Sequence, residues 1–162
     1  MPRSKSRNKR YTPKQVKLPS LPNALPVPSD MVRQWNHDLR DRLLRLKLAG
    51  FNGHDLALLA FSFGQIWLLA EAMSNCDEIR KSIEEGITQL DQNVLQSPAG
   101  ITDNVFNELV TLSEMSTEVL AASLKIEYIR ACDKLKKDGA VKFVDDFLVT
   151  LAKANLLEVT KE

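Results

Sequence analysis

The side chains that could hold a metal ion or act as general acids and bases are few and widely separated. The chain contains two histidines, His37 and His54, and two cysteines, Cys76 and Cys132. His37 and Asp41 lie one helical turn apart and could share a metal ion, but two ligands do not complete a site. The cysteines lack metal-type spacing and are expected to be buried thiols in a reducing compartment. We therefore predict no metal site and no disulfide.

Signatures of the common enzyme classes are also absent from the sequence. A ferritin-like di-iron bundle requires Glu-x-x-His twice, whereas Gln34 and Phe51 stand at the corresponding positions before the two histidines. The chain has no Gly-x-x-x-x-Gly-Lys loop, Gly-x-Gly-x-x-Gly turn, Gly-x-Ser-x-Gly elbow or Cys-x-x-Cys pair. The neighbouring acids Glu84–Glu85 and Asp145–Asp146 would point about 100° apart on a helix, which indicates solvated surface rather than a proton-sharing dyad. The sequence thus predicts a protein that is not an enzyme and uses no cofactor.

Residues 1–28 carry the strongest chemical signal in the chain, a cluster of cations without any acid. The basic residues are Arg3, Lys5, Arg7, Lys9, Arg10, Lys14 and Lys17, and Tyr11 directly follows Arg10. Clustered Lys and Arg can neutralise phosphates with release of counterions, and a tyrosine beside them can stack on a base. An acidic protein surface attracts the same charges. The predicted partners are therefore nucleic acid or an acidic protein or nucleoprotein surface, and a merely solubilising tail is the alternative.

Charge and proline content both change near Ser29. Six of the seven prolines precede this residue, and the chain from it onward holds 15 basic and 21 acidic residues. The net charge is therefore +7 for residues 1–28 and −6 for residues 29–162. Prolines stop helix propagation, so we expect residues 1–28 to form an extended arm, disordered when free, before one domain at residues 29–162. No long apolar segment follows the basic start as in a secretory signal, and the prolines oppose the amphipathic helix of a transit peptide. A cytoplasmic protein is expected.

From Ser29 onward the apolar residues recur at helical spacing, which predicts an all-α bundle of five or six helices. Ser29 or Asp30 is expected to cap a helix at about 31–49 that Gly50 ends, and Asp55 to cap an apolar helix at 56–70. Further helices are predicted at about 77–96, at 103–138 after a cap at Thr102 or Asp103, and at about 140–157 after a break at Gly139. The expected buried stripes of the first and third helices are Met31, Trp35, Leu39, Leu43 and Leu46, and Ile79, Ile83, Ile87, Leu90 and Val94.

The apolar segment 56–70 is the predicted hub of the core. Fifteen residues at about 1.5 Å each extend roughly 22 Å, which is less than the roughly 30 Å hydrocarbon layer of a bilayer. Ser62, Gly64 and Gln65 within the segment suit a helix that is surrounded by protein. We therefore expect a buried helix and no contact with a membrane.

The helical pattern at 103–138 is longer than a compact domain needs, because about 36 residues would extend roughly 54 Å. A kink near the polar stretch Ser113–Thr117 would shorten it and give six helices. Alternatively, a straight helix would project and pair with a second copy of the chain. The apolar positions drift rather than keep a strict heptad, so a homo-oligomer stays an open alternative.

A second basic surface is predicted on the first helix, where Arg33, Arg40 and Lys47 recur every seven residues and share one face. They are expected to extend the basic surface of the arm, although the internal pairs Asp38–Arg42 and Asp41–Arg45 weaken its field. A helix-turn-helix is excluded, because the segment 56–70 has no basic side chains to present to base edges.

Residues 7–14, Arg-Asn-Lys-Arg-Tyr-Thr-Pro-Lys, resemble the basic openings of small uncharacterised proteins encoded by phages and prophages of proteobacteria. The resemblance implies a phage-derived accessory protein that acts in the bacterial cytoplasm by binding a host or phage component, and it assigns no site residues. We accordingly expect a non-catalytic accessory or regulatory protein whose arm engages nucleic acid or a nucleoprotein assembly. The alternative is a protein-interaction or assembly module, an oligomer or an inhibitor of a host protein, that never contacts nucleic acid.

Overall fold

A computed structural model describes residues 25–71, 73, 77–97, 100–138 and 141–156. These residues form six helices, α2 (Ser29–Ala49), α3 (Gly53–Glu71), α4 (Asp77–Gln96), α5 (Asp103–Ala122), α6 (Lys125–Asp138) and α7 (Lys142–Lys153). Within these ranges there is no strand, and an isolated antiparallel bridge joins Pro26 to Leu124. The predicted all-α bundle is confirmed, with six helices.

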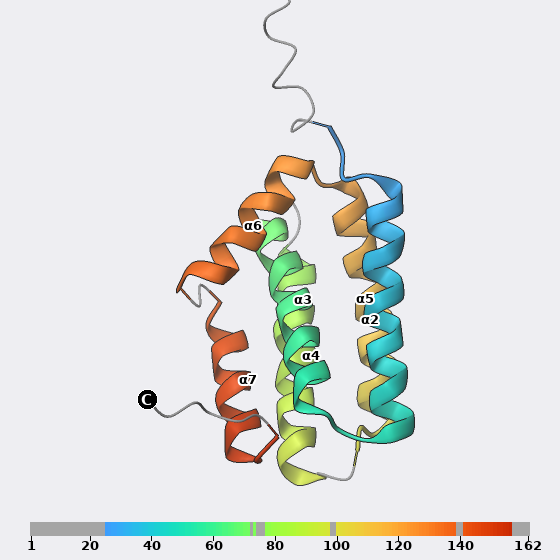
Figure 1. The fold of residues 1–162 in the computed structure, drawn as a ribbon, viewed down its shortest axis with the longest axis vertical. Helices are drawn as coiled ribbons and strands as arrows, with labels where there is room; N and C mark the ends of the chain where they lie inside the picture. Colours follow the sequence, from blue (N-terminus) through green and yellow to red (C-terminus); the bar gives the residue numbers. More distant parts are fainter. Residues whose placement is uncertain (1–24, 72, 74–76, 98–99, 139–140, 157–162) are drawn as a thin grey trace, which may run out of the picture.

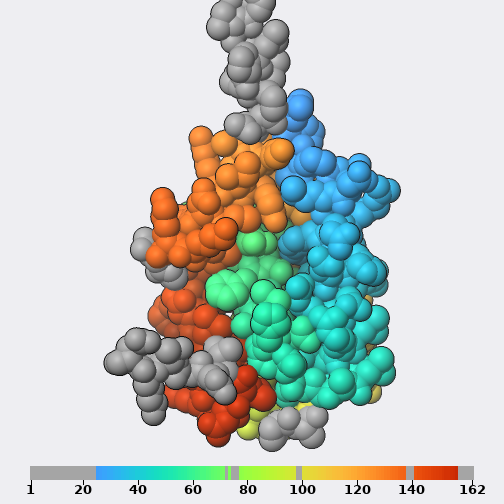
Figure 2. All heavy atoms as spheres, in the orientation of Figure 1, coloured from blue at the N-terminus to red at the C-terminus, as the bar shows by residue number. Residues whose placement is uncertain are grey.

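Helix α3 lies at the centre of the bundle and packs against each of the other five helices (Figure 1). Helices α2 and α5 lie side by side on one flank, and α6 and α7 cover the opposite one. Leu59, Phe63 and Ile66 of α3 are fully buried, as the hub prediction requires. On the face shown in Figure 2, α3 reaches the surface only in a strip between α2 and the two C-terminal helices.

Helix α3 is long enough to cross a membrane, contrary to the expectation from residues 56–70, although its burial is confirmed. The helix has 19 residues rather than fifteen, and by length and composition it could cross a bilayer. About two thirds of its apolar window is buried by other parts of the chain. The burial, and not the length, is therefore what identifies α3 as a core helix.

Helix α2 begins two residues earlier than expected and without a side-chain cap. Pro28 occupies the cap position, and its carbonyl accepts a hydrogen bond from the Val32 amide at 3.1 Å. Val32 is buried, whereas Met31, expected in the core, is 36% exposed, and Trp35 is half-buried. The remaining stripe residues Leu39, Leu43 and Leu46 are buried as predicted. Gly50 ends the helix with φ at +91°, a conformation that favours glycine.

The predicted cap of α3 is wrong by one turn. The Asn52 side chain accepts a hydrogen bond from the Asp55 amide at 3.1 Å, so Asn52 caps the helix and Asp55 lies in its first turn. Gly53 follows the cap in a space that admits no side chain, because a Cβ there would collide with the Leu156 carbonyl oxygen. The tight junction between α2 and α3 thus contacts the C-terminal end of the described chain.

The long pattern at 103–138 is interrupted at Ser123 and Leu124, not at the polar stretch Ser113–Thr117. The hydroxyls of Ser113 and Thr117 donate to carbonyls of their own helix, both at 2.7 Å, so these polar residues do not disturb α5. Ser123 instead has extended backbone angles. The turn divides the predicted helix of roughly 54 Å into two shorter helices. Both α5 and α6 pack on α3 of the same chain, so neither is the projecting helix that was expected to pair with a second copy.

The ends of the other helices are fixed by specific polar contacts. Thr102 caps α5 as predicted, through its hydroxyl and the Val105 amide. Asn93 ties the end of α4 to the start of α5, since its side chain accepts from the Thr102 amide at 2.9 Å and donates to the Gly100 carbonyl at 3.2 Å. Helix α4 has the expected bounds and buried stripe, whereas α7 is shorter than expected. Gly139 lies outside the described residues.

Candidate nucleic-acid interface

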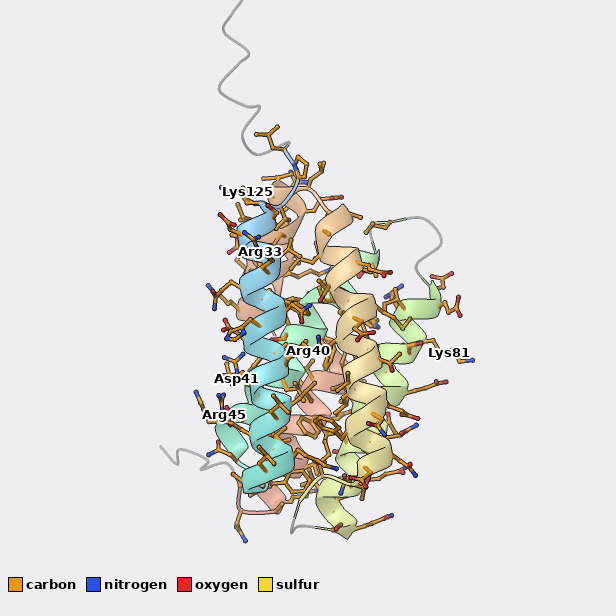
Figure 3. All side chains as sticks on the ribbon, turned by 90° about the vertical axis from the view of Figure 1, so that its right-hand side faces the viewer. Arg33, Arg40, Asp41, Arg45, Lys81 and Lys125 are labelled. Atoms are coloured by element: carbon orange, nitrogen blue, oxygen red, sulfur yellow. The ribbon has the colours of Figure 1, made fainter. Side chains whose placement is uncertain are left out.

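The inner end of the predicted arm is attached to the body by backbone hydrogen bonds. The Val27 amide donates to the Ser123 carbonyl at 3.0 Å, and the Lys125 amide donates to the Leu25 carbonyl at 2.8 Å. The Val27 side chain is buried, with 4% exposure. Residues 25–28, assigned to the free arm, therefore belong to the folded body. The contact lies at the junction of α5 and α6 (Figure 3).

The arm's candidate binding residues lie outside the described part of the chain. These are Arg3, Lys5, Arg7, Lys9, Arg10, Tyr11, Lys14 and Lys17. The structure gives instead the point at which the chain leaves the body, next to Leu25. Arg33 and Lys125 both lie at this end of the bundle (Figure 3). Lys125 was not among the predicted residues, because its position beside the arm depends on the turn at Ser123.

The three cations predicted to form a stripe on α2 each have an acidic neighbour. Arg33 contacts Asp30 one turn earlier, and both side chains are highly exposed. Arg40 lies 3.7 Å from Glu114 of α5. Lys47 contacts Asp103 at the start of α5, and its ammonium lies 5.2 Å from the centre of the Phe106 ring.

Of the predicted stripe, Arg33 alone lies beside the arm, whereas the other two cations join α2 to α5. Exposed ion pairs contribute little and are screened by salt, so they do not exclude contact with phosphates. They nevertheless reduce the free positive charge along α2. The basic surface that extends the arm is thus smaller than the recurrence of a cation every seven residues along α2 indicated.

Arg45 forms the most extensive charge cluster among the described residues, and its arrangement is structural. Its guanidinium makes two bonds to Asp55, at 2.9 and 3.1 Å, and also contacts Asp41. The hydrogen bonds from Arg45 lower the pKa of the buried Asp55 carboxyl. Of the two predicted internal pairs, Asp41–Arg45 is formed, whereas Asp38 accepts from Gln34 at 2.8 Å. The cluster fixes α2 against the start of α3.

The described residues also place Cys132 in a setting that opposes nucleophilic chemistry. Gln65 donates a long hydrogen bond of 3.5 Å to its sulfur. Burial raises the pKa of the Cys132 thiol, and it raises that of the adjacent Tyr128 to about 12. Both groups are therefore protonated at neutral pH. His37 and His54 are exposed, and within the described ranges no three potential ligands converge on a metal site.

The acidity of the body is concentrated on two neighbouring helices, a feature that the sequence analysis missed. Helix α4 carries five acids and two bases, and α5 carries four acids and no base. Helices α2 and α6 each carry five bases and three acids. Counting charge for each predicted helix could have revealed this difference. Because α4 packs against α5, the two acidic helices are neighbours, although Asp103 and Glu114 of α5 pair with cations of α2.

Comparison of the chain with protein-family models, with curated protein sequences and with solved structures finds no match.

Proposed function

We propose that the protein is a non-catalytic accessory or regulatory protein whose basic arm binds nucleic acid or a nucleoprotein assembly. The observation that carries the proposal is the separation of charge, with seven cations and no acid in the first 28 residues and a net charge of −6 in the rest. Such an arm can neutralise several phosphates at once, and the affinity comes largely from released counterions. The acidic body is repelled by the same phosphates, which limits contact to the arm and its base.

The attachment of residues 25–28 supports a defined geometry for this interaction. Two backbone hydrogen bonds and the buried Val27 hold the arm at the end of the bundle where Arg33 and Lys125 lie. A nucleic acid bound to the arm would therefore meet these cations before it meets the acidic helices. The resemblance of residues 7–14 is what supports a phage-derived protein that acts in the bacterial cytoplasm.

The salt dependence of binding tests the proposal. Each phosphate contact with duplex DNA contributes about −0.9 to the slope of log affinity against log salt, so four to six contacts predict a slope of about −4 to −5. Lys9→Ala/Arg10→Ala should reduce its magnitude by roughly two. The matched control is Lys136→Ala/Lys137→Ala, which removes two exposed cations from the last turn of α6 and should leave the slope nearly unchanged. Fluorescence anisotropy with a labelled duplex, repeated at several salt concentrations, measures the affinity of all three proteins and hence the slope.

An acidic protein partner is the second candidate, and nuclease treatment separates the two. Affinity capture from the native cell with the full chain, with and without nuclease, should lose its partners on digestion if nucleic acid carries the interaction. Partners retained after digestion, together with no duplex binding at physiological salt, would overturn the nucleic-acid proposal. A protein-interaction module would then be the better description.

A further inference from the structure

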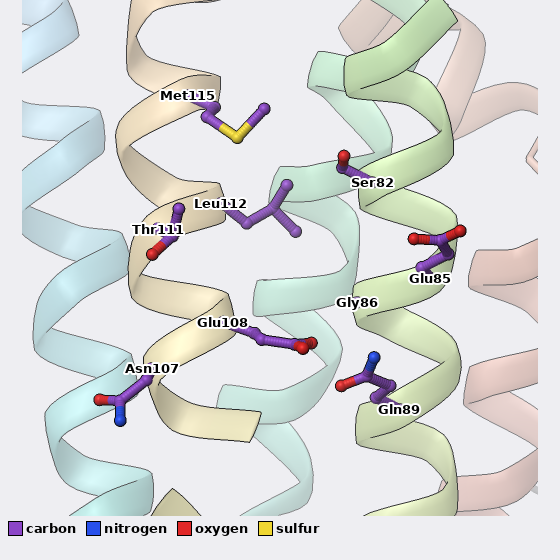
Figure 4. Close-up of a pocket in the computed structure, with 9 residues that line it drawn as sticks. All are labelled: Ser82, Glu85, Gly86, Gln89, Asn107, Glu108, Thr111, Leu112 and Met115. Carbon is purple, nitrogen blue, oxygen red and sulfur yellow. The ribbon is translucent and has the colours of Figure 1, made fainter. Parts of the chain in front are cut away.

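Helices α4 and α5 pack side by side but leave a groove between their exposed faces. One hollow of about 390 Å³ lies midway along the pair, where Gly86 of α4 brings the helices close together (Figure 4). A Cβ at Gly86 would lie 2.9 Å from Leu112, so a larger residue would fill the floor of the hollow. Leu112 and Met115 reach from α5 towards α4 and form the apolar part of this floor.

A second hollow of about 350 Å³ continues the groove towards the arm. It shares Met115 with the first and is lined further by Ile79, Val119 and Ala122. Ala122 is the last residue of α5, and the carbonyl of the next residue, Ser123, accepts the hydrogen bond from the Val27 amide. The groove thus ends one residue from the point where the arm is attached.

Acidic side chains border this apolar floor on both helices. Glu78 and Glu85 line it from α4, and Glu108 and Glu118 line it from α5. The residues described provide one cation within 4 Å of these four carboxylates, Lys81, which lies 3.9 Å from Glu85. The groove therefore combines apolar surface with unneutralised negative charge, which suits an extended chain that carries both apolar and basic side chains.

We propose that this groove binds the arm of the same chain, residues 1–24. The arm carries seven cations, interspersed near its inner end with Val16, Leu18 and Leu21. An extended chain of that length reaches roughly 80 Å, whereas the groove from Ala122 to Asn107 measures roughly 22 Å along α5. Because the arm is attached beside the end of the groove, its effective concentration there is in the millimolar range, well above that of a second copy in solution.

This inference rests on the proposed function, because its consequence is competition for the same cations. Arm residues that lie on α4 and α5 are not available to phosphates, and a nucleic acid must displace them before it binds. The acidic groove then acts as an internal competitor that lowers affinity for weak or short nucleic acids. Removing its carboxylates should free the arm and strengthen binding.

Zero-length carbodiimide cross-linking of the full chain tests the location of the arm without any nucleic acid. The reagent joins a lysine amine to a carboxylate in direct contact. We expect peptides that join Lys14 or Lys17 to Glu108 or Glu118 within monomeric protein at low salt. Lys142 and Asp146, whose charged groups are 2.7 Å apart on α7, are the internal positive control.

Two outcomes of this experiment would overturn the proposal. Arm lysines that join no carboxylate of α4 or α5, while Lys142 is joined to Asp146, would show that the groove does not hold the arm. Cross-links found only in covalent dimers would identify a second copy as the occupant. Since no nucleic acid is present, either result is independent of whether the proposed function holds.

Binding measurements with charge variants provide the second test. Glu108→Gln/Glu118→Gln should raise affinity for a labelled duplex by about two- to tenfold at low salt, because the competing site is weakened. The matched control, Asp133→Asn/Asp145→Asn, removes two exposed acids of α6 and α7 and changes the net charge equally. An equal gain in both variants would indicate general repulsion and would overturn a specific role for the groove.

Discussion

At the scale of single residues, α2 is held in the bundle by a buried stripe of leucines and by ion pairs to α5. Leu39, Leu43 and Leu46 were predicted to be buried because they repeat along one helix face, and they are. The partners of Arg40 and Lys47 could not be predicted, because both contact α5, and the packing of α5 against α2 is a tertiary property. Spacing within a helix shows which residues share a face, but not every pair that it allows is formed, since Asp38 accepts from Gln34 rather than pairing with Arg42. Contacts between helices also require the relative rotation of both.

The contact between Arg45 and Asp55 leads to a prediction about pH. Arg45 lowers the pKa of Asp55 in the folded protein, so the carboxyl stays ionised to lower pH there than in the unfolded chain, where its pKa is about 3.9. The contact therefore stabilises the fold above pH 4 and ceases to do so as the pH falls through the folded-state pKa. Asp55→Asn should lower the free energy of unfolding by about 1 kcal/mol at pH 7 and by less at pH 3, which is below the unfolded-state pKa. Urea denaturation at both pH values measures the difference.

Asp41→Asn is the matched control for this prediction. Asp41 contacts the same guanidinium, but its side chain is 52% exposed against 12% for Asp55, so its loss should cost less. A loss of stability in the Asp55 variant that is equal at pH 3 and pH 7 would show that the carboxylate charge is not what stabilises the junction.

At the scale of the helices, local pattern predicted which elements form, and long-range contact decided where one of them is interrupted. The apolar spacing across 103–138 gives no sign of a break at Ser123, and its polar stretch lies ten residues earlier. The turn is instead paired with Leu25 and Val27, nearly one hundred residues away in the chain. Glu127 completes it locally by accepting from the Leu124 amide at 2.8 Å. Only this last contact could have been read from neighbouring residues.

The central position of α3 predicts that a charge introduced there will unfold the body. Leu59 and Ile66 are fully buried, and an unpaired carboxylate in their place would cost several kcal/mol, comparable with the whole stability of such a domain. Leu59→Asp or Ile66→Asp should therefore abolish cooperative unfolding and most helicity, as followed by circular dichroism. Leu48→Asp, at a position 83% exposed on α2, is the control and should leave the midpoint within a few degrees. Folded Leu59 and Ile66 variants with unchanged midpoints would contradict the central role of α3.

At the scale of the whole molecule, charge is distributed so that opposite signs lie close together. The arm is attached where α5 ends, and α5 is the helix with four acids and no base. Net charges of the two segments could be predicted from the sequence, but not their adjacency, because it depends on the pairing of Leu25–Val27 with Ser123–Lys125. The same pairing moves the limit of the folded body into the segment predicted to be a free arm.

That shifted limit gives a prediction for two truncated proteins, one lacking residues 1–24 and one lacking residues 1–28. Removal of 1–24 should change the melting temperature by less than about 3 °C at 0.3 M salt, where exposed ion pairs between arm and groove are screened. Removal of 1–28 also eliminates three backbone hydrogen bonds, two to the turn between α5 and α6 and one from the Val32 amide to the Pro28 carbonyl, and the buried Val27 side chain. These contribute about 2–4 kcal/mol together, which corresponds to a decrease of roughly 5–15 °C. Calorimetry of the full chain and both truncations measures the difference; equal melting temperatures for the two truncations would show that residues 25–28 do not stabilise the body.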